Sequence, residues 1–342
     1  MKHLLAWELE KATATIQDSQ RILVAGHINP DGDTIGSLLA LGLGLERLNK
    51  QVVMVSQDGV PDRYKSLPGT NRVLTAYEEG VDLAISVDCG SLELLGTTQK
   101  AFSLSKKILQ IDHHDVGKRF GDYLLIDSSL AAAGEEVYYL LNALGVEIDL
   151  AIAKCLLTSL VVETNSFRLP NVTDQTFKIC SELLNKGVDF PAFVQEIFWK
   201  KDATACRLFG LSLSRVVLDC GGKLAWSVLR QEDFTELGGK ESDVDDVADA
   251  IRTIDGVLVA VFFREQNDGT LRVSLRSRGG INVGEVSEKF GGGGHWDVAG
   301  CKIIKGGDRA IAAILGELTS LIKQVKLSGL PRPDMQAGRE PS

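Results

Sequence analysis

Short apolar runs that end in polar or acidic residues recur through the first part of the chain, and helical patterns alternate with them. Continuous Val/Ile/Leu runs of this length are typical of strands buried on both faces. Their alternation with helices predicts βαβ units and a doubly wound, mainly parallel sheet, in which ligands lie at the carboxyl ends of the strands. The runs are RILVAGH from Arg21, QVVMVSQD from Gln51, VDLAISVDCG from Val81, KKILQIDHHD from Lys106 and DYLLIDSS from Asp122.

The second half of the chain carries a different pattern. Helices dominate from Ala131 to Ser214, and the strand-like runs LAWSVLR, GVLVAVFFREQ, TLRVSLRS and CKIIKG follow with interspersed helices. This pattern predicts a smaller mixed α/β domain. We expect a catalytic domain over 1–186, a helical linker over 187–216, a substrate-binding domain over 217–326 and a disordered tail over 327–342.

The composition limits the classes of function. A net charge of −9 argues against a protein that binds long duplex nucleic acid, because such binding needs an excess of Lys and Arg. Six scattered cysteines, without a CxxC pair or a secretory leader, indicate reduced thiols in the cytoplasm. No apolar stretch is long enough to cross a membrane. We therefore expect a cytoplasmic protein without a membrane partner.

The loop after the first predicted strand, GHINPDGDTIGS, places His27, Asp31 and Asp33 close together. An EF-hand calcium loop is excluded, because its fifth position is Ile35 and its twelfth is Gly42, where a bidentate Glu is required. Taken singly, His27 can be read as a core histidine and Asp33 as a helix N-cap. Three such side chains at the end of one strand favour a functional site.

Two further strand ends carry the same residue types. Asp88 follows the strand that ends in ISVDCGS, and Asp112, His113 and His114 follow the next in QIDHHD. A mixed set of nitrogen and oxygen donors suits Mn²⁺ better than Ca²⁺. The number of such side chains exceeds what one ion needs, so the sequence predicts two divalent ions that could assist phosphoryl transfer.

HINPDGDTIGS, SVDCGS and IDHH, in this order, resemble the first three motifs of the DHH phosphoesterase superfamily. The stretch SLRSRGGINVGEVSEKFGGGGHWDVAG resembles the DHH-associated substrate-binding domain. The resemblance spans roughly Arg21 to Ile304. Within the superfamily the chain is most similar to the NrnA-type nanoRNases, which also act as adenosine 3′,5′-bisphosphate phosphatases.

The resemblance implies two sets of metal ligands that share Asp88 as a bridge. One ion takes His27, Asp31 and Asp88, and the other takes Asp33, Asp88, His113 and Glu163. Asp112 is implied to orient His113, and His114 to face the substrate phosphate. The nucleophile implied by the resemblance is a metal-bridging hydroxide.

The fourth motif departs from the family pattern. The family reads Asp-Thr-Gly-Ser-Phe there, whereas this chain has Glu163, Thr164, Asn165, Ser166 and Phe167. The extra methylene of Glu163 moves its oxygens by about 1.5 Å unless the backbone retreats. Asn165 constrains the loop, although Asn accepts left-handed geometry better than most residues. Retained catalysis and an impaired, nucleotide-binding sensor both stay open.

The predicted strand LRVSLRSR indicates a substrate-binding surface in the second domain. Alternation places Arg272, Ser274, Arg276 and Arg278 on one face, provided that the strand runs that far. For Arg272, a solvent-exposed position at the edge of the strand is a sufficient explanation. For Arg276 we expect a phosphate contact, since a guanidinium matches phosphate geometry. Ser274 and Arg278 are expected to bind substrate with it.

The glycine-rich stretch FGGGGH lacks the Lys-Ser/Thr of a Walker loop. Gly292, Gly293 and Gly294 are expected to let backbone amides approach a phosphate or base, with His295 as a hydrogen-bond donor. Trp296 follows and can stack on a base or pack in the core. Asp297 adds a negative charge near the expected phosphate site.

Together these features predict a metal-dependent phosphoesterase, most similar to enzymes that hydrolyse short oligoribonucleotides to mononucleotides, adenosine 3′,5′-bisphosphate to AMP, or both. We expect the substrate between the two domains. A cyclic-dinucleotide or pApA phosphodiesterase is an alternative, and so is the impaired sensor. The last helical pattern, from Asp308 to Val325, can be read as a homodimer surface or as a cover of the second sheet.

Overall fold

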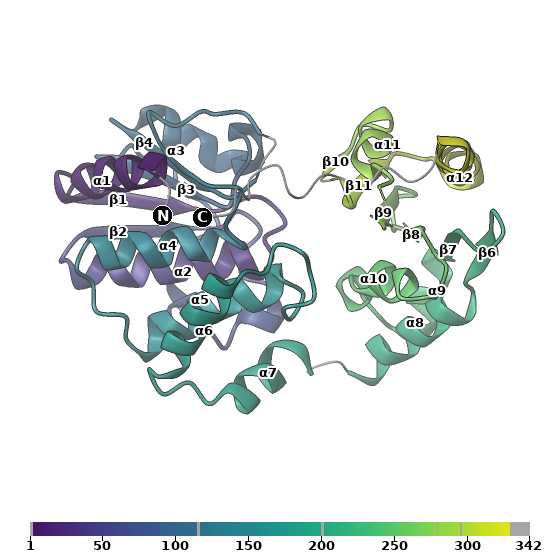
Figure 1. Ribbon diagram of the computed structural model, residues 1–342, viewed down its shortest axis with the longest axis horizontal. Coiled ribbons are helices and arrows are strands. Elements are labelled where there is room, and N and C mark those ends of the chain that lie inside the picture. The colour runs from purple at the N-terminus through teal and green to yellow at the C-terminus, as the bar shows by residue number, and fades with distance from the viewer. Residues whose placement is uncertain (1–2, 115–116, 200–201, 279, 295, 329–342) are drawn as a thin grey trace. The chain divides into compact units, whose positions relative to one another are not determined.

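The computed structural model describes residues 3–114, 117–199, 202–278, 280–294 and 296–328, and Figure 1 shows their elements. The chain divides into two compact units, 1–200 and 201–342, and the boundary between them falls inside the range expected as a linker. The helices of the first unit are α1 (His3–Gln17), α2 (Gly32–Arg47), α3 (Gln99–Leu104), α4 (Ala133–Ala143), α5 (Leu150–Glu163), α6 (Asp174–Leu184) and α7 (Phe190–Phe198).

The first unit is built on a five-stranded, entirely parallel sheet. Its strands are β1 (Arg21–Ala25), β2 (Gln51–Val55), β3 (Leu83–Val87), β4 (Ile108–Asp112) and β5 (Tyr123–Ile126), in the order β2-β1-β3-β4-β5. All five are strands that the apolar runs predict. The chain moves outward from β1 to β2 and then returns to β3 on the other side of β1. The carboxyl ends of β1 and β3 therefore flank the point at which the winding reverses, where such sheets bind ligands.

Helices cover both faces of this sheet because its strands are apolar on both sides. Ile22 and Val24 of β1 face the larger core, with α1, α2, α4 and α5. Leu23 and Ala25 face a smaller core on the opposite side, which includes Phe102 of α3. A doubly wound unit results, and the predicted fold class of the N-terminal domain is confirmed.

The second unit holds a mixed six-stranded sheet with the order β10-β11-β9-β8-β7-β6. Only β7 and β8 pair in parallel, and the other neighbours are antiparallel. The strands are β6 (Val217–Asp219), β7 (Leu224–Leu229), β8 (Val259–Glu265), β9 (Leu271–Ser277), β10 (Gly293–Gly294) and β11 (Val298–Ile303). The helices are α8 (Ala203–Ser214), α9 (Gln231–Leu237), α10 (Val247–Arg252), α11 (Val283–Lys289) and α12 (Gly307–Ser328).

Two apolar cores lie on opposite faces of this second sheet. Val261 of β8 packs in one core with Ile314 and Leu318 of α12. Phe262, the next residue of β8, packs in the other core with Leu208 of α8 and Ile251 of α10. The alternation along β8 thus places helices on both faces, and the predicted mixed α/β domain is confirmed.

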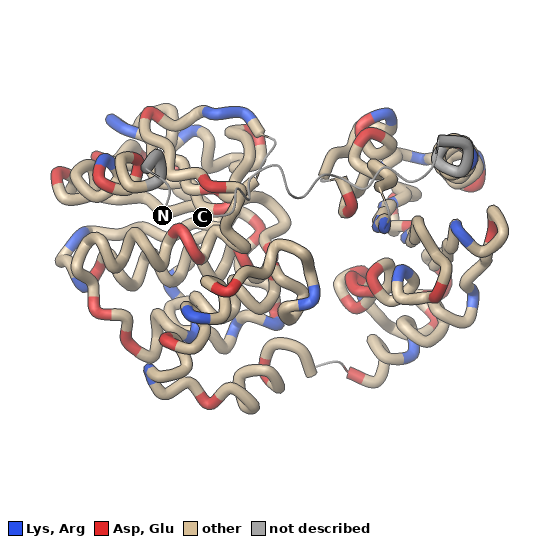
Figure 2. The backbone as a smooth tube through the Cα atoms, in the orientation of Figure 1, with Lys and Arg blue, Asp and Glu red and all other residues tan. Residues whose placement is uncertain are grey.

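Charged residues of both signs are interspersed along both units (Figure 2). Among the described residues, no helix combines the length and apolar composition needed to span a bilayer. Helix α12 reaches Ser328, and the rest of the tail predicted to be disordered lies outside the described residues.

Candidate metal centre

Asp31 and Asp33 lie at the junction between β1 and α2. Asp31 is the N-cap of α2, since its Oδ1 accepts hydrogen bonds from the backbone N–H groups of Asp33 at 2.9 Å and Thr34 at 3.0 Å. The cap is therefore Asp31 and not Asp33, because α2 begins at Gly32, two residues earlier than a cap at Asp33 would require. Asp33 lies in the first turn of α2 and is completely buried.

Asp33 is held by hydrogen bonds from three different helices. Its Oδ1 accepts from the hydroxyls of Ser159 at 2.6 Å and Ser37 at 3.0 Å, and from the backbone N–H of Gly134 at 3.3 Å. Its Oδ2 accepts from the backbone N–H of Ala133 at 2.9 Å. Because these donors leave the carboxylate little freedom, the direction of Oδ2 is fixed by the fold.

His27, Thr34 and Asp88 form a second connected group. The Oγ1 of Thr34 lies 2.7 Å from His27 Nε2 and donates to Asp88 Oδ2 at 2.7 Å. His27 Nδ1 lies 2.7 Å from the carbonyl oxygen of Ile28, which fixes the ring and leaves Nε2 toward Asp88 at 3.4 Å. Asp88 itself has a φ of 52°, a left-handed conformation that is uncommon outside glycine and concentrates at functional sites.

The buried carboxylates have opposite pKa shifts. Burial, together with the neighbouring charge of Asp88, raises the pKa of Asp33 to about 6. Burial also disfavours charge on His27 and Asp88, but their mutual hydrogen bond outweighs it, raising the pKa of His27 to about 10 and lowering that of Asp88. Two buried carboxylates share a site with imidazoles, and this is an environment that a cation would stabilise.

His113 presents a nitrogen to these carboxylates. Its Nε2 is buried and has no hydrogen-bond partner among the described residues. Three carboxylate oxygens surround it, with Asp33 Oδ2 at 3.4 Å, Asp88 Oδ1 at 3.7 Å and Glu163 Oε1 at 3.9 Å. Buried polar atoms are nearly always paired, so an unpaired nitrogen facing three acids fits a divalent cation that prefers nitrogen and oxygen donors.

The ligand-type side chains fall into three groups, and within each group the ligand atoms lie within 4.8 Å of one another. The groups are His27, Asp31 and Asp88; Asp33, His113 and Glu163; and Asp88, His113 and His114. Asp88 belongs to two groups and lies near the third through its contact with His113. The structure thus brings together all six side chains that the family resemblance implies as metal ligands.

Asp112 contacts a different ring from the one implied by the resemblance. Its Oδ1 lies 2.6 Å from Nδ1 of His114, whereas it reaches His113 only through the backbone N–H at 3.0 Å. The reason is local, because Asp112 Oδ1 also lies near the backbone N–H groups of the two residues that follow it. Burial disfavours the charged His114 ring, but the hydrogen bond to Asp112 prevails and raises the pKa of His114 to about 9.

In the second unit, β9 alternates as the sequence predicts, because Arg272, Ser274 and Arg276 are partly exposed and the residues between and beside them are buried. Arg276 donates from Nε to Asp249 Oδ1 at 3.0 Å, and the hydroxyl of Ser274 lies 3.3 Å from Nη2 of the buried Arg264. The strand ends at Ser277, so its alternation does not extend to Arg278, which is exposed.

The glycines expected to form a phosphate-binding loop also have a packing role. A side chain at Gly292 would lie 2.3 Å from the carbonyl oxygen of Gly300, and Gly293 and Gly294 form β10 against β11. His295 lies outside the described residues. Trp296 is half exposed, and Asp297 lies 3.9 Å from Nη1 of Arg252.

Several residues that shape the site did not stand out in the sequence. Ser37 lies one helical turn after Asp33, and that spacing could have indicated the contact. Thr34 directly follows Asp33, and no sequence pattern indicates that its hydroxyl joins His27 to Asp88. Ser159 is 126 residues from Asp33 in the chain, and no local pattern predicts their hydrogen bond.

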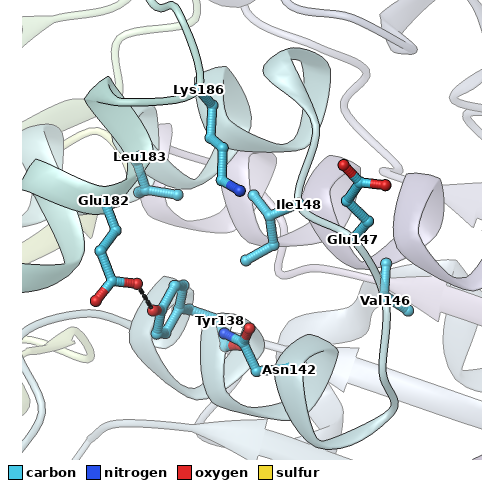
Figure 3. Close-up of a pocket in the computed structure, with 8 residues that line it drawn as sticks. All are labelled: Tyr138, Asn142, Val146, Glu147, Ile148, Glu182, Leu183 and Lys186. Carbon is cyan, nitrogen blue, oxygen red and sulfur yellow. Dashed lines mark hydrogen bonds between the residues drawn. The ribbon is translucent and has the colours of Figure 1, made fainter.

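A separate cavity of about 150 Å³ lies between α4, α6 and the loop after α4 (Figure 3). Tyr138 donates a hydrogen bond to Glu182 at its wall, and Lys186 lines it as well. None of the residues that the sequence assigned to the site lines this cavity, which is therefore distinct from the metal-type cluster.

Comparison with known proteins relates both units to one family. The model described as "DHH family, N-terminal domain" matches residues 21–160, and the model described as "DHHA1 domain" matches residues 221–324. The chain is similar to the bifunctional oligoribonuclease and PAP phosphatase NrnA of Thermus thermophilus, with 33% identity over 92% of this chain and 95% of that protein.

Two further similarities extend this comparison. The cyclic-di-AMP phosphodiesterase GdpP of Geobacillus thermodenitrificans is 25% identical over 82% of this chain, which matches 44% of that protein. The crystal structure of an exopolyphosphatase-related protein from Bacteroides fragilis has the same fold, with a TM-score of 0.86, 23% identity, and coverage of 93% of this chain and 98% of that one. From the paired domain matches and the near full-length similarity to NrnA, the chain belongs to the DHH family and carries a DHHA1 domain.

Proposed function

We propose that this protein is a metal-dependent phosphoesterase that hydrolyses short oligoribonucleotides to mononucleotides, adenosine 3′,5′-bisphosphate to AMP, or both. The observation that carries the proposal is the unpartnered Nε2 of His113, buried among the carboxylates of Asp33, Asp88 and Glu163. The similarity to NrnA over nearly the whole chain supports the substrate class.

We infer that two divalent ions, with Mn²⁺ preferred, occupy this cluster. His27, Asp31 and Asp88 would hold one, and Asp33, Asp88, His113 and Glu163 the other. Mixed imidazole and carboxylate donors favour Mn²⁺ over Ca²⁺, which prefers oxygen alone. Bound ions would supply water activation and neutralise charge on the phosphoryl group. The chain itself contributes the fixed direction of Asp33, which Ser159 and Ser37 hold by hydrogen bonds.

His114 and Asp112 form the proton-handling pair in this proposal. Asp112 Oδ1 accepts from His114 Nδ1 at 2.6 Å, so a proton on the ring is stabilised near neutral pH. In that state the ring can donate from Nε2 to a phosphate oxygen or to the leaving oxygen. Asp112 is a positioning residue, because it acts through the ring.

Residues of the second unit are proposed to bind the part of the substrate that does not react. Arg276 offers a guanidinium whose Nε is already oriented by Asp249, and the flanking hydrogen-bond donors are Ser274 and Arg278. The backbone of Gly292, Gly293 and Gly294 and the ring of His295 complete the proposed set. Guanidinium and amide donors bind phosphate oxygens without selecting the base, so we expect little sequence preference.

A linear or cyclic dinucleotide phosphodiesterase is the second candidate, and the similarity to GdpP is the observation that favours it. The test is product-resolved hydrolysis of a 5′-labelled RNA ladder beside adenosine 3′,5′-bisphosphate, pApA and cyclic di-AMP, with Mn²⁺ and after chelation. Mn²⁺-dependent conversion of the shortest RNAs to mononucleotides supports the first proposal, and cyclic di-AMP cleavage with inert RNA supports the second. Nucleotide binding without turnover of any substrate overturns both and identifies a sensor.

A further inference from the structure

The segment that follows Glu163 has an unusual backbone. Asn165, Ser166 and Phe167 have φ angles of 46°, 58° and 61°, so three successive residues other than glycine are left-handed. Side chains rarely adopt this conformation, because the Cβ atom lies close to the following carbonyl oxygen. Such a turn persists only where surrounding contacts hold it.

The turn closes the carboxyl end of α5 with a defined hydrogen-bond pattern. The backbone N–H of Asn165 donates to the carbonyl of Val162 at 2.9 Å, and that of Ser166 donates to Val161 at 2.7 Å. This is the Schellman arrangement, whose left-handed position is usually glycine and sometimes asparagine. Asn165 occupies that position.

Arg168 binds Asn165 with two groups. Its Nε donates to the carbonyl oxygen of Asn165 at 2.7 Å, and its Nη2 donates to the side-chain Oδ1 of Asn165 at 2.5 Å. The second contact needs the asparagine side chain, and glycine cannot provide it. These two hydrogen bonds from Arg168 therefore stabilise a left-handed conformation that glycine would adopt without them.

The turn also fixes the position of Glu163. Glu163 is the last residue of α5, and its Oε1 lies 3.9 Å from Nε2 of His113. Thr164, the next residue, is completely buried and donates from Oγ1 to the carbonyl of Leu160 at 2.6 Å while it accepts from the N–H of Phe167 at 3.0 Å. A change in the turn would therefore move the helix end that carries the carboxylate.

We propose that Arg168 is a positioning residue that holds Asn165 in its left-handed conformation and so sets the approach of Glu163 to Asp33 and His113. The inference rests on the proposed function, because it concerns the side chains assigned to the second metal ion. The carboxylate of Glu163 stays near His113 only if the end of α5 keeps its position. The contacts between Arg168 and Asn165 hold the turn that fixes this position.

The test compares Arg168→Ala, Asn165→Gly and the double variant by Mn²⁺ titration with electron paramagnetic resonance, which counts free and bound ions without measuring turnover. We expect Arg168→Ala to weaken the second Mn²⁺ by about tenfold and leave the first unchanged. The double variant should recover wild-type affinity, because glycine adopts the turn without these hydrogen bonds from Arg168. Arg47→Ala is the matched control, since Arg47 pairs with Asp149 at the opposite end of α5.

Hydrogen exchange at the amides of Ser166 and Phe167 in the metal-free protein gives a second readout that needs no ion. Faster exchange in Arg168→Ala, reversed in the double variant, supports the proposal. Unchanged exchange and Mn²⁺ affinity in Arg168→Ala overturn it, and so does a double variant that remains as weak as the single one. A wild-type protein that binds fewer than two ions while Arg168→Ala still speeds exchange contradicts the metal proposal and leaves the turn assignment supported.

Discussion

The two units balance their buried charges in different ways. In the first, the carboxylates of Asp33 and Asp88 lie beside a His113 nitrogen that has no hydrogen-bond partner among the described residues. In the second, the buried guanidinium of Arg264 donates to Asp245 at 2.5 Å and to the carbonyl of Glu241 at 3.0 Å. In the first unit an imidazole nitrogen faces three carboxylates without a hydrogen bond, whereas in the second unit the buried guanidinium has an acid beside it and only its Nε lacks a hydrogen-bond partner among the described residues.

The two units therefore depend on their ligands in different ways. Buried carboxylates that lie close together are costly, as the raised pKa of Asp33 indicates, so the first unit should gain stability when a cation binds. The stability of the second unit should change little when a phosphate binds, because each guanidinium that contacts the phosphate already contacts an acid of the protein. We therefore expect metal to control stability in the first unit and the second unit to affect substrate affinity alone.

The largest effect is expected from Asp88→Asn. Asp88 belongs to two of the three ligand groups and contacts the hydroxyl of Thr34, so its loss removes charge from the whole cluster. We expect kcat/KM on a short RNA to fall by about 10³-fold, or about 4 kcal/mol of transition-state stabilisation. Asp174→Asn, which removes an exposed pair with Lys178, should leave the rate unchanged. Equal losses in both variants would show that the effect is on folding.

The effect of Mn²⁺ on hydrogen exchange should differ between the two units. At a Mn²⁺ concentration one hundred times the dissociation constant, the first unit should gain about 2.7 kcal/mol. Hydrogen exchange should therefore slow in β1, β3 and β4 and stay constant in β8 and β9. Equal slowing in both sheets would contradict the assignment of metal to the first unit alone.

A pair of glycines distinguishes the packing of the two units. At Gly36 an added Cβ would lie 2.5 Å from the carbonyl oxygen of Cys155 and 2.8 Å from the N atom of Ser159, so α2 could not stay close to α5. Gly36→Ala should cost about 1–3 kcal/mol of unfolding free energy and weaken the hydrogen bond from Ser159 to Asp33. The measurement is denaturant unfolding of the metal-free protein.

Gly210→Ala is the matched control in α8, where no heavy atom other than the neighbouring residues and the local helix backbone lies within 4 Å of the added carbon. Alanine is the better helix former, so a gain of up to about 1 kcal/mol is expected. If Gly36→Ala were as well tolerated, close approach of α2 and α5 would not be what positions Asp33.

The sequence allowed the frame of the first unit to be predicted because its signals are local. Each parallel strand is a short apolar run, and the ligand-type residues follow these runs directly, as His27 follows β1 and Asp88 follows β3. In a parallel sheet such positions must meet at one edge, whatever the lengths of the helices between them. The fold class and the clustering of these residues therefore follow from the pattern, whereas the inclusion of Glu163 and the division into two ligand sets were implied by the family resemblance.

Contacts that depend on side-chain direction were not predictable in the same way. Asp112 lies one residue before His113 and two before His114, and only the side-chain conformations decide that it contacts the ring of His114. The hydrogen bond from Arg276 to Asp249 joins β9 to α10. The residues next to either one in the sequence give no indication of this contact. Tertiary packing determines which of these side chains meet, and no local sequence pattern predicts it.

Arg276 carries the next smaller expected effect. Arg276→Gln should raise KM for a short RNA by about tenfold, which is about 1.4 kcal/mol of binding, while kcat and Mn²⁺ affinity stay constant. Asp249→Asn should lower KM, because Arg276 would no longer share its Nε with an internal acid. An unchanged KM in Arg276→Gln would remove the phosphate contact from the proposal.

The smallest effect is expected at the thiols. Cys89 lies next to Asp88 and is buried, and burial raises the pKa of its thiol to about 12, so almost no thiolate exists at neutral pH. Cys206 in the second unit is exposed. Iodoacetamide at neutral pH should modify Cys206 first, leave Cys89 intact as judged by peptide mass spectrometry, and leave the hydrolysis rate unchanged. Rapid loss of activity with modification of Cys89 would indicate a thiolate nucleophile, and the chemistry could then no longer be attributed to the carboxylate and imidazole cluster.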